Sequence, residues 1–183
     1  MRRATWVLLF LAALAVVLPQ VVVPLVLPPG SVHVPVAPSP GEPATWPYAF
    51  GALVCHQLPD RSFAIAENQL PVCERCLAIE LGMAAALAAA VLVAPRGGFV
   101  AALSAFLPGR LRSRAGVLAI GIALVLPMVL DGGLQLATTY VSDTPQRLLT
   151  GFLYGVGQAG VVIGLAAWLL DDWSESLMGS PGR

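Results

Sequence analysis

Long apolar runs without charge dominate the pattern along the chain. Residues 4–41 carry no charged side chain, and neither do residues 81–95, 115–130 and 148–170. A helix needs ~20 apolar residues to cross the ~30 Å of hydrocarbon in a bilayer. The pattern therefore predicts four membrane-spanning helices, at about residues 5–27, 77–93, 115–139 and 148–170. We expect Pro19 and Pro24 to bend the first of them or end it early.

Composition supports a membrane protein and gives no indication of an enzyme. Hydrophobic residues make up 57% of the chain and charged residues only 11%, about half the charged fraction of a soluble domain. A soluble fold would have to bury helices that are apolar all round. The expected class is therefore all-α, a polytopic bundle with a three-helix core and an added N-terminal span. A net charge of zero argues against nucleic acid, so the expected partner is the lipid bilayer.

The chain divides into four segments by composition. Residues 1–27 form the first span, although Arg2 and Arg3 before an apolar run also suit a signal peptide or an uncleaved signal anchor. Residues 28–47 hold seven prolines and are expected to form an extended linker. Residues 48–170 form the main membrane domain, and residues 171–183 a cytoplasmic tail.

The arginines predict an orientation. If the spans alternate in direction, the arginines before the first span and those between the second and third spans lie on the same side of the membrane. These six are Arg2, Arg3, Arg96, Arg110, Arg112 and Arg114. Cytoplasmic loops carry the arginine excess, so the N-terminus is expected in the cytoplasm and residues 28–76 outside, in a bacterial plasma (inner) membrane. Trp6 and Trp168 would then lie at the inner interface, where tryptophan is enriched.

The segment between the first two spans carries the candidate chemistry. Cys55 and His56 are followed, after sixteen intervening residues, by Cys73-x-x-Cys76. Two such pairs resemble the spacing of a structural zinc site, which needs four nitrogen or sulfur ligands in a tetrahedron. Three thiolates and one imidazole around a divalent ion leave one negative charge. Arg61 and Arg75 are close enough in sequence to compensate it.

The cysteines also allow other interpretations. Outside the cytoplasm, Cys73 and Cys76 can form a disulfide, and Cys55 can exchange with it as in a membrane thiol–disulfide oxidoreductase. Alternatively, all three are ordinary thiols with neither role. A position near a helix N-terminus would lower the pKa of Cys73. Glu80 shares the helical stripe of Cys73 and Cys76, or it is simply a residue at headgroup level.

The third span carries a polar pair. Asp131 and Gln135 are four residues apart and share one helix face. A carboxylate at this depth should face a partner or a water-filled cavity, and Arg75 and Arg147 are the candidate partners. The pair either fixes helix packing or belongs to a small transporter or transporter accessory.

The cysteine segment resembles the membrane-protein family called Domain of Unknown Function 2085. The similar residues begin with Cys55-His56, Pro59 and Arg61-Ser62-Phe63, continue with Gln69, Pro71, Cys73, Arg75 and Cys76, and end with Asp131, Gln135, Arg147, Thr150 and Gly151. The resemblance covers about residues 46–165. Leu77-Ala78-Ile79-Glu80 stands where the family usually has Thr-Gly-Ile-Tyr, so Glu80 is not a family feature.

The resemblance implies a helical membrane fold but no particular chemistry. The function favoured by the residues is binding of a metal ion such as zinc through Cys55, His56, Cys73 and Cys76, with no other cofactor. Oxidoreductase and transporter functions remain the alternatives.

Overall fold

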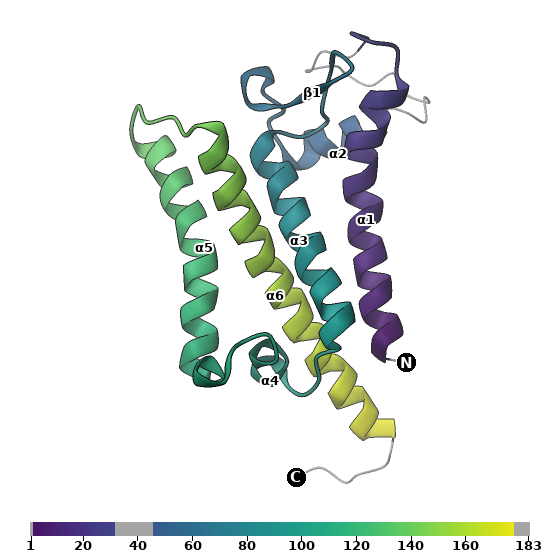
Figure 1. Cartoon of the computed structure of the whole chain (residues 1–183), viewed down its shortest axis with the longest axis vertical. Helices are drawn as coiled ribbons and strands as arrows, with labels where there is room; N and C mark the ends of the chain where they lie inside the picture. The colour runs from purple at the N-terminus through teal and green to yellow at the C-terminus, as the bar shows by residue number, and fades with distance from the viewer. Residues whose placement is uncertain (1, 32–45, 178–183) are drawn as a thin grey trace.

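The computed structural model describes residues 2–31 and 46–177. Four long helices lie beside one another, and short elements close the two ends of the bundle (Figure 1). The long helices are α1 (Arg2–Val26), α3 (Glu74–Val93), α5 (Arg114–Ala137) and α6 (Thr144–Leu177). The short elements are helices α2 (Trp46–Val54) and α4 (Phe99–Ser104), the 3₁₀ turns η2 (Pro59–Arg61) and η3 (Gly109–Leu111), and strands β1 (Ala64–Ile65) and β2 (Asn68–Gln69).

The four long helices confirm the predicted all-α membrane bundle. Each is long and apolar enough to cross a bilayer, with a mean hydropathy between 1.7 and 2.6 over its best window. The shortest of them, α3, has 20 residues, which corresponds to ~30 Å of helix. The chain is therefore a multi-pass membrane protein.

The prolines do not end the first span early, because α1 continues through both of them. Each proline removes one backbone hydrogen bond from the helix. The carbonyl of Pro24 would normally bond to the N–H of residue 28, but Pro28 has none. The side-chain amide of Asn68 donates to this carbonyl at 3.0 Å instead, so a group from outside the helix satisfies its last turn.

The other boundaries differ in smaller ways. The sixth helix extends to Leu177, through much of the segment assigned above to a tail. Of the expected linker at 28–47, residues 32–45 lie outside the described residues, as do 178–183 at the end of the tail. Residues 46 and 47 already belong to α2.

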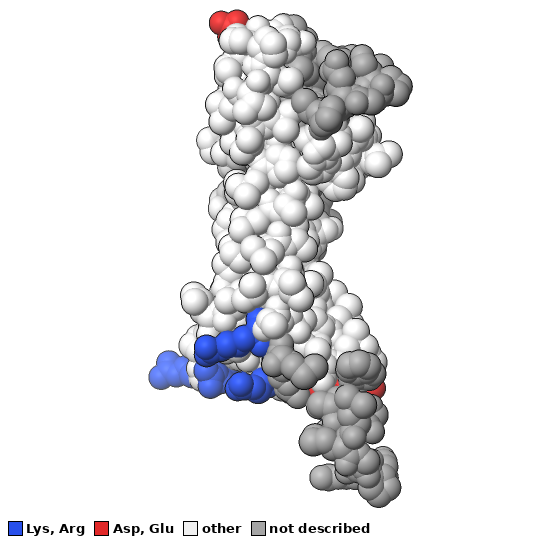
Figure 2. Space-filling model, turned by 90° about the vertical axis from the view of Figure 1, so that its right-hand side faces the viewer, with Lys and Arg blue, Asp and Glu red and all other residues white. Residues whose placement is uncertain are grey.

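Helix α3 lies between α1 and α6, and α5 packs on α6 (Figure 1). The β1–β2 hairpin and α2 lie at one end of the bundle, and α4 lies at the other. On the face shown in Figure 2, the visible arginine side chains gather at the end where α4 lies in Figure 1. The cysteine segment thus lies at the opposite end from the arginine-rich one, as the alternating spans predicted.

Glycines allow α3 and α6 to approach closely. A Cβ built on Gly82 of α3 would overlap the carbonyl oxygen of Phe152, and one built on Gly155 of α6 would overlap that of Ile79. Backbones this close gain dispersion energy, which is what joins helices where lipid removes the hydrophobic drive. The α3–α6 contact is therefore the centre of the bundle.

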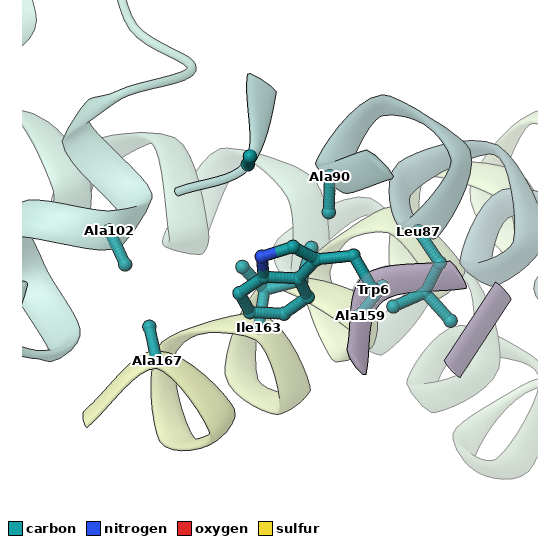
Figure 3. Packing of buried hydrophobic residues seen from close by; sticks show 8 residues of the cluster. Trp6, Leu87, Ala90, Ala102, Ala159, Ile163 and Ala167 are labelled. Carbon is teal, nitrogen blue, oxygen red and sulfur yellow. The ribbon is translucent and has the colours of Figure 1, made fainter. Parts of the chain in front are cut away.

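A second contact joins α1 to this centre through Trp6. Its ring is fully buried among small side chains that include Ala90, Ala159 and Ala167 (Figure 3). Trp6 was expected at the level of the inner interface, but its ring faces the other helices and not lipid, because small residues on α3, α4 and α6 leave a space of its size. Trp168, in contrast, is half-exposed.

The glycine contact predicts a large difference between two alanine substitutions in α6. Gly155→Ala should lower the free energy of unfolding by about 1–3 kcal/mol, because its methyl group would meet the backbone of α3. Gly160→Ala is the control, since its Cβ would lie 3.7 Å from Leu103, an ordinary contact. Thermal unfolding in detergent measures both. Equal stability of the two variants would contradict the close contact.

Candidate functional site

A short hairpin reverses the chain between the two cysteine positions. Strands β1 and β2 pair antiparallel, with Ile65 opposite Asn68. The two turn residues, Ala66 and Glu67, both have positive φ, of 52° and 64°. Two-residue hairpins favour this left-handed conformation because it matches the twist of the strands. The turn sends the chain back toward the residues that follow α2.

Buried amides hold the two arms of the segment together. The side chain of Gln57 donates to the carbonyls of Tyr48 at 3.0 Å and Pro71 at 2.7 Å. The side chain of Gln69 donates to the carbonyl of Gln57 at 2.9 Å, and the Tyr48 hydroxyl donates to the carbonyl of Gln69 at 2.8 Å. Buried backbone carbonyls need such partners, so these side chains fix the end of α2 against the start of α3.

This arrangement brings the three cysteines together. Cys55 directly follows α2, Cys73 is the N-cap residue of α3 and Cys76 lies in its first turn. The ligand atoms of the three lie within 4.8 Å of one another. The backbone N–H of Cys73 donates to the Cys55 sulfur at 3.2 Å, and the N–H of Gln57 donates to it at 3.4 Å.

The three thiols have unequal proton affinities. Hydrogen bonds from the Cys55 and Cys76 thiols, with the N–H of Cys76, lower the pKa of Cys73. The pKa of Cys55 is raised, first because its thiol donates a hydrogen bond to Cys73. Cys73 is therefore the thiol that ionises first. A thiolate is the form that binds metals and attacks disulfides.

His56 lies outside the group of three thiols, although it lines the same cavity. This cavity has a volume of about 360 Å³ and is lined by Cys55, Cys73, Cys76 and His56, together with three arginines, Arg61, Arg75 and Arg147. His56 is exposed. A small ligand can therefore reach the thiols from the protein surface through this cavity.

An ion pair between a buried carboxylate and a partly buried guanidinium joins α3 to α5 beside the thiols. The Arg75 guanidinium pairs with the Asp131 carboxylate and also donates to Ser142 at 3.0 Å. Gln135 donates to Asp131 at 3.3 Å and accepts from Arg61 at 3.3 Å. Arg75 and Arg147 were both considered as partners of Asp131, and in the structure Arg75 forms the ion pair.

Arg147 pairs instead with a carboxylate that the sequence analysis did not single out. Its guanidinium lies 3.2 Å from Glu74, and the Thr144 hydroxyl donates to the same carboxylate at 2.9 Å. Glu74 and Arg147 are both buried. This second pair joins α3 to α6.

The structure therefore collects most of the candidate residues at one end of the bundle. The three thiols form one group, and Arg61, Arg75, Asp131 and Gln135 form a connected polar network next to it. Glu80 is half-buried farther along α3, outside both. The sequence analysis missed Glu74, Tyr48, Gln57 and Ser142. Only Glu74 gave a signal, as an acidic residue in the first turn of a helix, where carboxylates are favoured.

The geometry defines an integral membrane protein with a thiol-rich site at one end of a helical bundle. A family model described as "Predicted membrane protein (DUF2085)" matches residues 55–162, which is more than half of the chain. The chain belongs to this family. The match includes the cysteines, the polar network and spans α3 and α5, and it begins after α1.

Two archaeal proteins resemble the same region. An uncharacterized protein of Methanocaldococcus jannaschii is 32% identical over 109 residues, which cover 59% of this chain and 60% of that protein. An uncharacterized protein of Methanothermobacter thermautotrophicus is 33% identical over 106 residues, 58% of this chain and 81% of that protein. The chain thus matches three fifths of the length of the first. Because both relatives are archaeal, they do not support the expected location in a bacterial plasma membrane. No solved structure matches the chain.

The Arg75–Asp131 pair predicts a strong dependence of stability on its partners. Asp131→Leu should lower the free energy of unfolding by about 3–5 kcal/mol, because it leaves the Arg75 charge buried without its counter-ion. The double variant Arg75→Leu, Asp131→Leu should recover much of this loss, because no unpaired charge remains. Thermal unfolding of the three proteins in detergent measures the difference. A double variant less stable than the single one would refute this account.

Proposed function

We propose that the protein binds one zinc ion through the thiolates of Cys55, Cys73 and Cys76. The supporting observation is their mutual distance, within 4.8 Å. Zn–S bonds of ~2.3 Å in a tetrahedron place sulfurs ~3.8 Å apart, so a small contraction is enough to bind the ion. Thiolates are soft ligands that favour zinc or copper(I) over calcium or magnesium.

The fourth position of the ion would face the cavity. His56 lines this cavity and is the one candidate among the predicted ligands that does not already lie in the thiol group. Rotation of its side chain would complete the Cys₃His set expected from the sequence. Otherwise a water molecule or an external ligand takes the position, as in zinc sites that keep one open.

The surrounding charges suit a site with one excess negative charge. Arg75 and Arg147 are already paired with carboxylates. Arg61 contacts the amide of Gln135 and lies 3.6 Å from Asp60, whose side chain is 72% exposed. A pair this exposed is weak, so Arg61 supplies the compensating positive charge. Pairing of Asp131 with Arg75 favours a role in holding the site together over a role in transport.

A redox function is the second candidate, and the lowered pKa of Cys73 supports it. An ionised Cys73 can attack a disulfide, and Cys76 or Cys55 can resolve the mixed disulfide. The cavity gives a partner thiol access to the site. Zinc binding and this exchange use the same sulfurs, so they exclude each other at any one time.

The zinc proposal predicts about one ion per chain in protein purified in detergent. Cys55→Ser, Cys73→Ser and Cys76→Ser should each reduce the content to below ~0.1 ion, because each removes one of the ligands. Glu80→Gln is the control and should keep the ion. Elemental analysis together with a free-thiol count measures both. A Cys73–Cys76 disulfide without zinc would refute the proposal in favour of redox exchange.

His56→Ala assigns the fourth position. If His56 is the fourth ligand, its removal should weaken zinc affinity at least about tenfold, which competition with a chelator measures. An unchanged affinity would assign the position to a water molecule or an external ligand.

We also propose that the thiol site faces the exterior, because the arginine-rich end is the cytoplasmic one by the positive-inside rule. In a chain whose only cysteine is Cys55, a membrane-impermeant maleimide should label intact cells. Gly109→Cys in a cysteine-free chain is the control and should react only after permeabilisation, since Gly109 lies in η3 at the arginine-rich end. The reverse labelling pattern would refute this orientation.

A further inference from the structure

A second, larger cavity lies within the membrane-spanning part of the molecule. It has a volume of about 780 Å³ and is lined by α5 on one side and by α3 and α6 on the other, with α4 and the residues after it at one end. Its lining includes Ala89 of α3, Phe99 of α4, Gly121 and Val125 of α5, and Val156 of α6. All of its lining residues are apolar or glycine, so it has no part in the chemistry of the thiol site.

The cavity opens sideways along α5. Leu118, Ile122 and Leu126 line it and are also 64%, 52% and 45% exposed. They are four residues apart and follow one stripe of the helix. Such a stripe on a membrane span meets lipid rather than water, so hydrocarbon can enter the cavity from the side.

One end of the cavity adjoins positive charge. Leu107 lines the cavity, and its carbonyl accepts a hydrogen bond from Nε of Arg112 at 2.9 Å. This bond holds the Arg112 guanidinium at the rim. Arg110 and Arg114 flank it, and all three are exposed. Within the described residues, none of the three makes an ion pair.

We propose that this cavity binds one hydrocarbon chain of an anionic phospholipid, with the phosphate held by Arg112 and Arg110. The apolar lining matches the chain, and the arginines at one end match the charge of the headgroup. Arginine forms bidentate hydrogen bonds with phosphate, and basic residues at a membrane surface attract anionic lipids. The lipid would fill the space between α5 and the α3–α6 pair and so fix the position of α5.

The site is independent of zinc. It lies on the arginine-rich side of the bundle, whereas the thiols lie at the opposite end. Helices α3, α5 and α6 pass both sites, but no residue that lines the cavity also lines the thiol cavity. Loss of zinc binding would therefore leave the lipid proposal intact, and the reverse also holds.

Native mass spectrometry of protein stripped of lipid and then incubated with one lipid tests the proposal. The probes are phosphatidylglycerol and phosphatidylcholine with identical acyl chains. We expect retention of one phosphatidylglycerol, at least about tenfold tighter than phosphatidylcholine. In the double variant Arg110→Gln, Arg112→Gln, each lost arginine should weaken phosphatidylglycerol binding about fivefold or more. The control is Arg96→Gln, which lies outside the cavity rim and should leave this binding unchanged.

A second pair of variants tests the cavity itself. A Cβ on Gly121 or Gly133 of α5 would meet nothing within 4 Å, but only Gly121 lines the cavity. Gly121→Leu should fill it and displace the lipid, and Gly133→Leu should not. Leucine favours a helix more than glycine does, so both variants should fold. If Gly121→Leu does not fold, the arginine variants still decide.

Three results would overturn the proposal. The first is equal retention of the two lipids, which would indicate general solvation by hydrocarbon. The second is unchanged phosphatidylglycerol binding in Gly121→Leu or in the Arg110 and Arg112 double variant. The third is conversion of a dimer to a monomer by Gly121→Leu, because a second copy of the chain would then be the occupant.

Discussion

The arrangement of the molecule depends on two adjacent charges of opposite sign in the first turn of α3. Glu74 points to Arg147 of α6, and Arg75 points to Asp131 of α5. Buried charges require partners, because desolvation of an unpaired one costs several kcal/mol. Successive residues of a helix point in different directions, so each charge determines a different neighbour. One turn of helix thereby positions two other spans, and the same turn carries two of the three thiols.

Hydrogen bonds hold the other side of the thiol site in place. Its other arm, which ends in Cys55, is held not by charge but by the buried amides of Gln57 and Gln69 and the hydroxyl of Tyr48. These groups satisfy backbone carbonyls in a loop that has almost no regular structure of its own. Sulfur atoms from distant parts of the sequence are therefore held close together before any ion binds, which reduces the entropy lost on binding.

Sequence alone predicted the parts of this structure that follow from local rules. Uncharged runs gave the four spans because lipid imposes a minimum apolar length. The spacing of Asp131 and Gln135 gave a common face, since the helical period is fixed. It did not decide between Arg75 and Arg147 as the partner, because that choice depends on how three helices rotate about one another. The burial of Trp6 was missed for the same reason: the alanines that receive it lie on other helices.

The bond between Asn68 and the end of α1 ties the first helix to the part of the chain that the family model matches. The family match begins at residue 55, downstream of α1, and the surface of α3 that α1 covers is largely apolar. Lipid would cover that surface about as well, so lipid could replace α1 over most of this contact. The side-chain amide of Asn68 donates to the carbonyls of Pro24 at 3.0 Å and Pro28 at 3.1 Å. Hydrocarbon cannot accept these hydrogen bonds in place of α1. A chain without such a helix would need another acceptor for this amide, or a different residue at position 68.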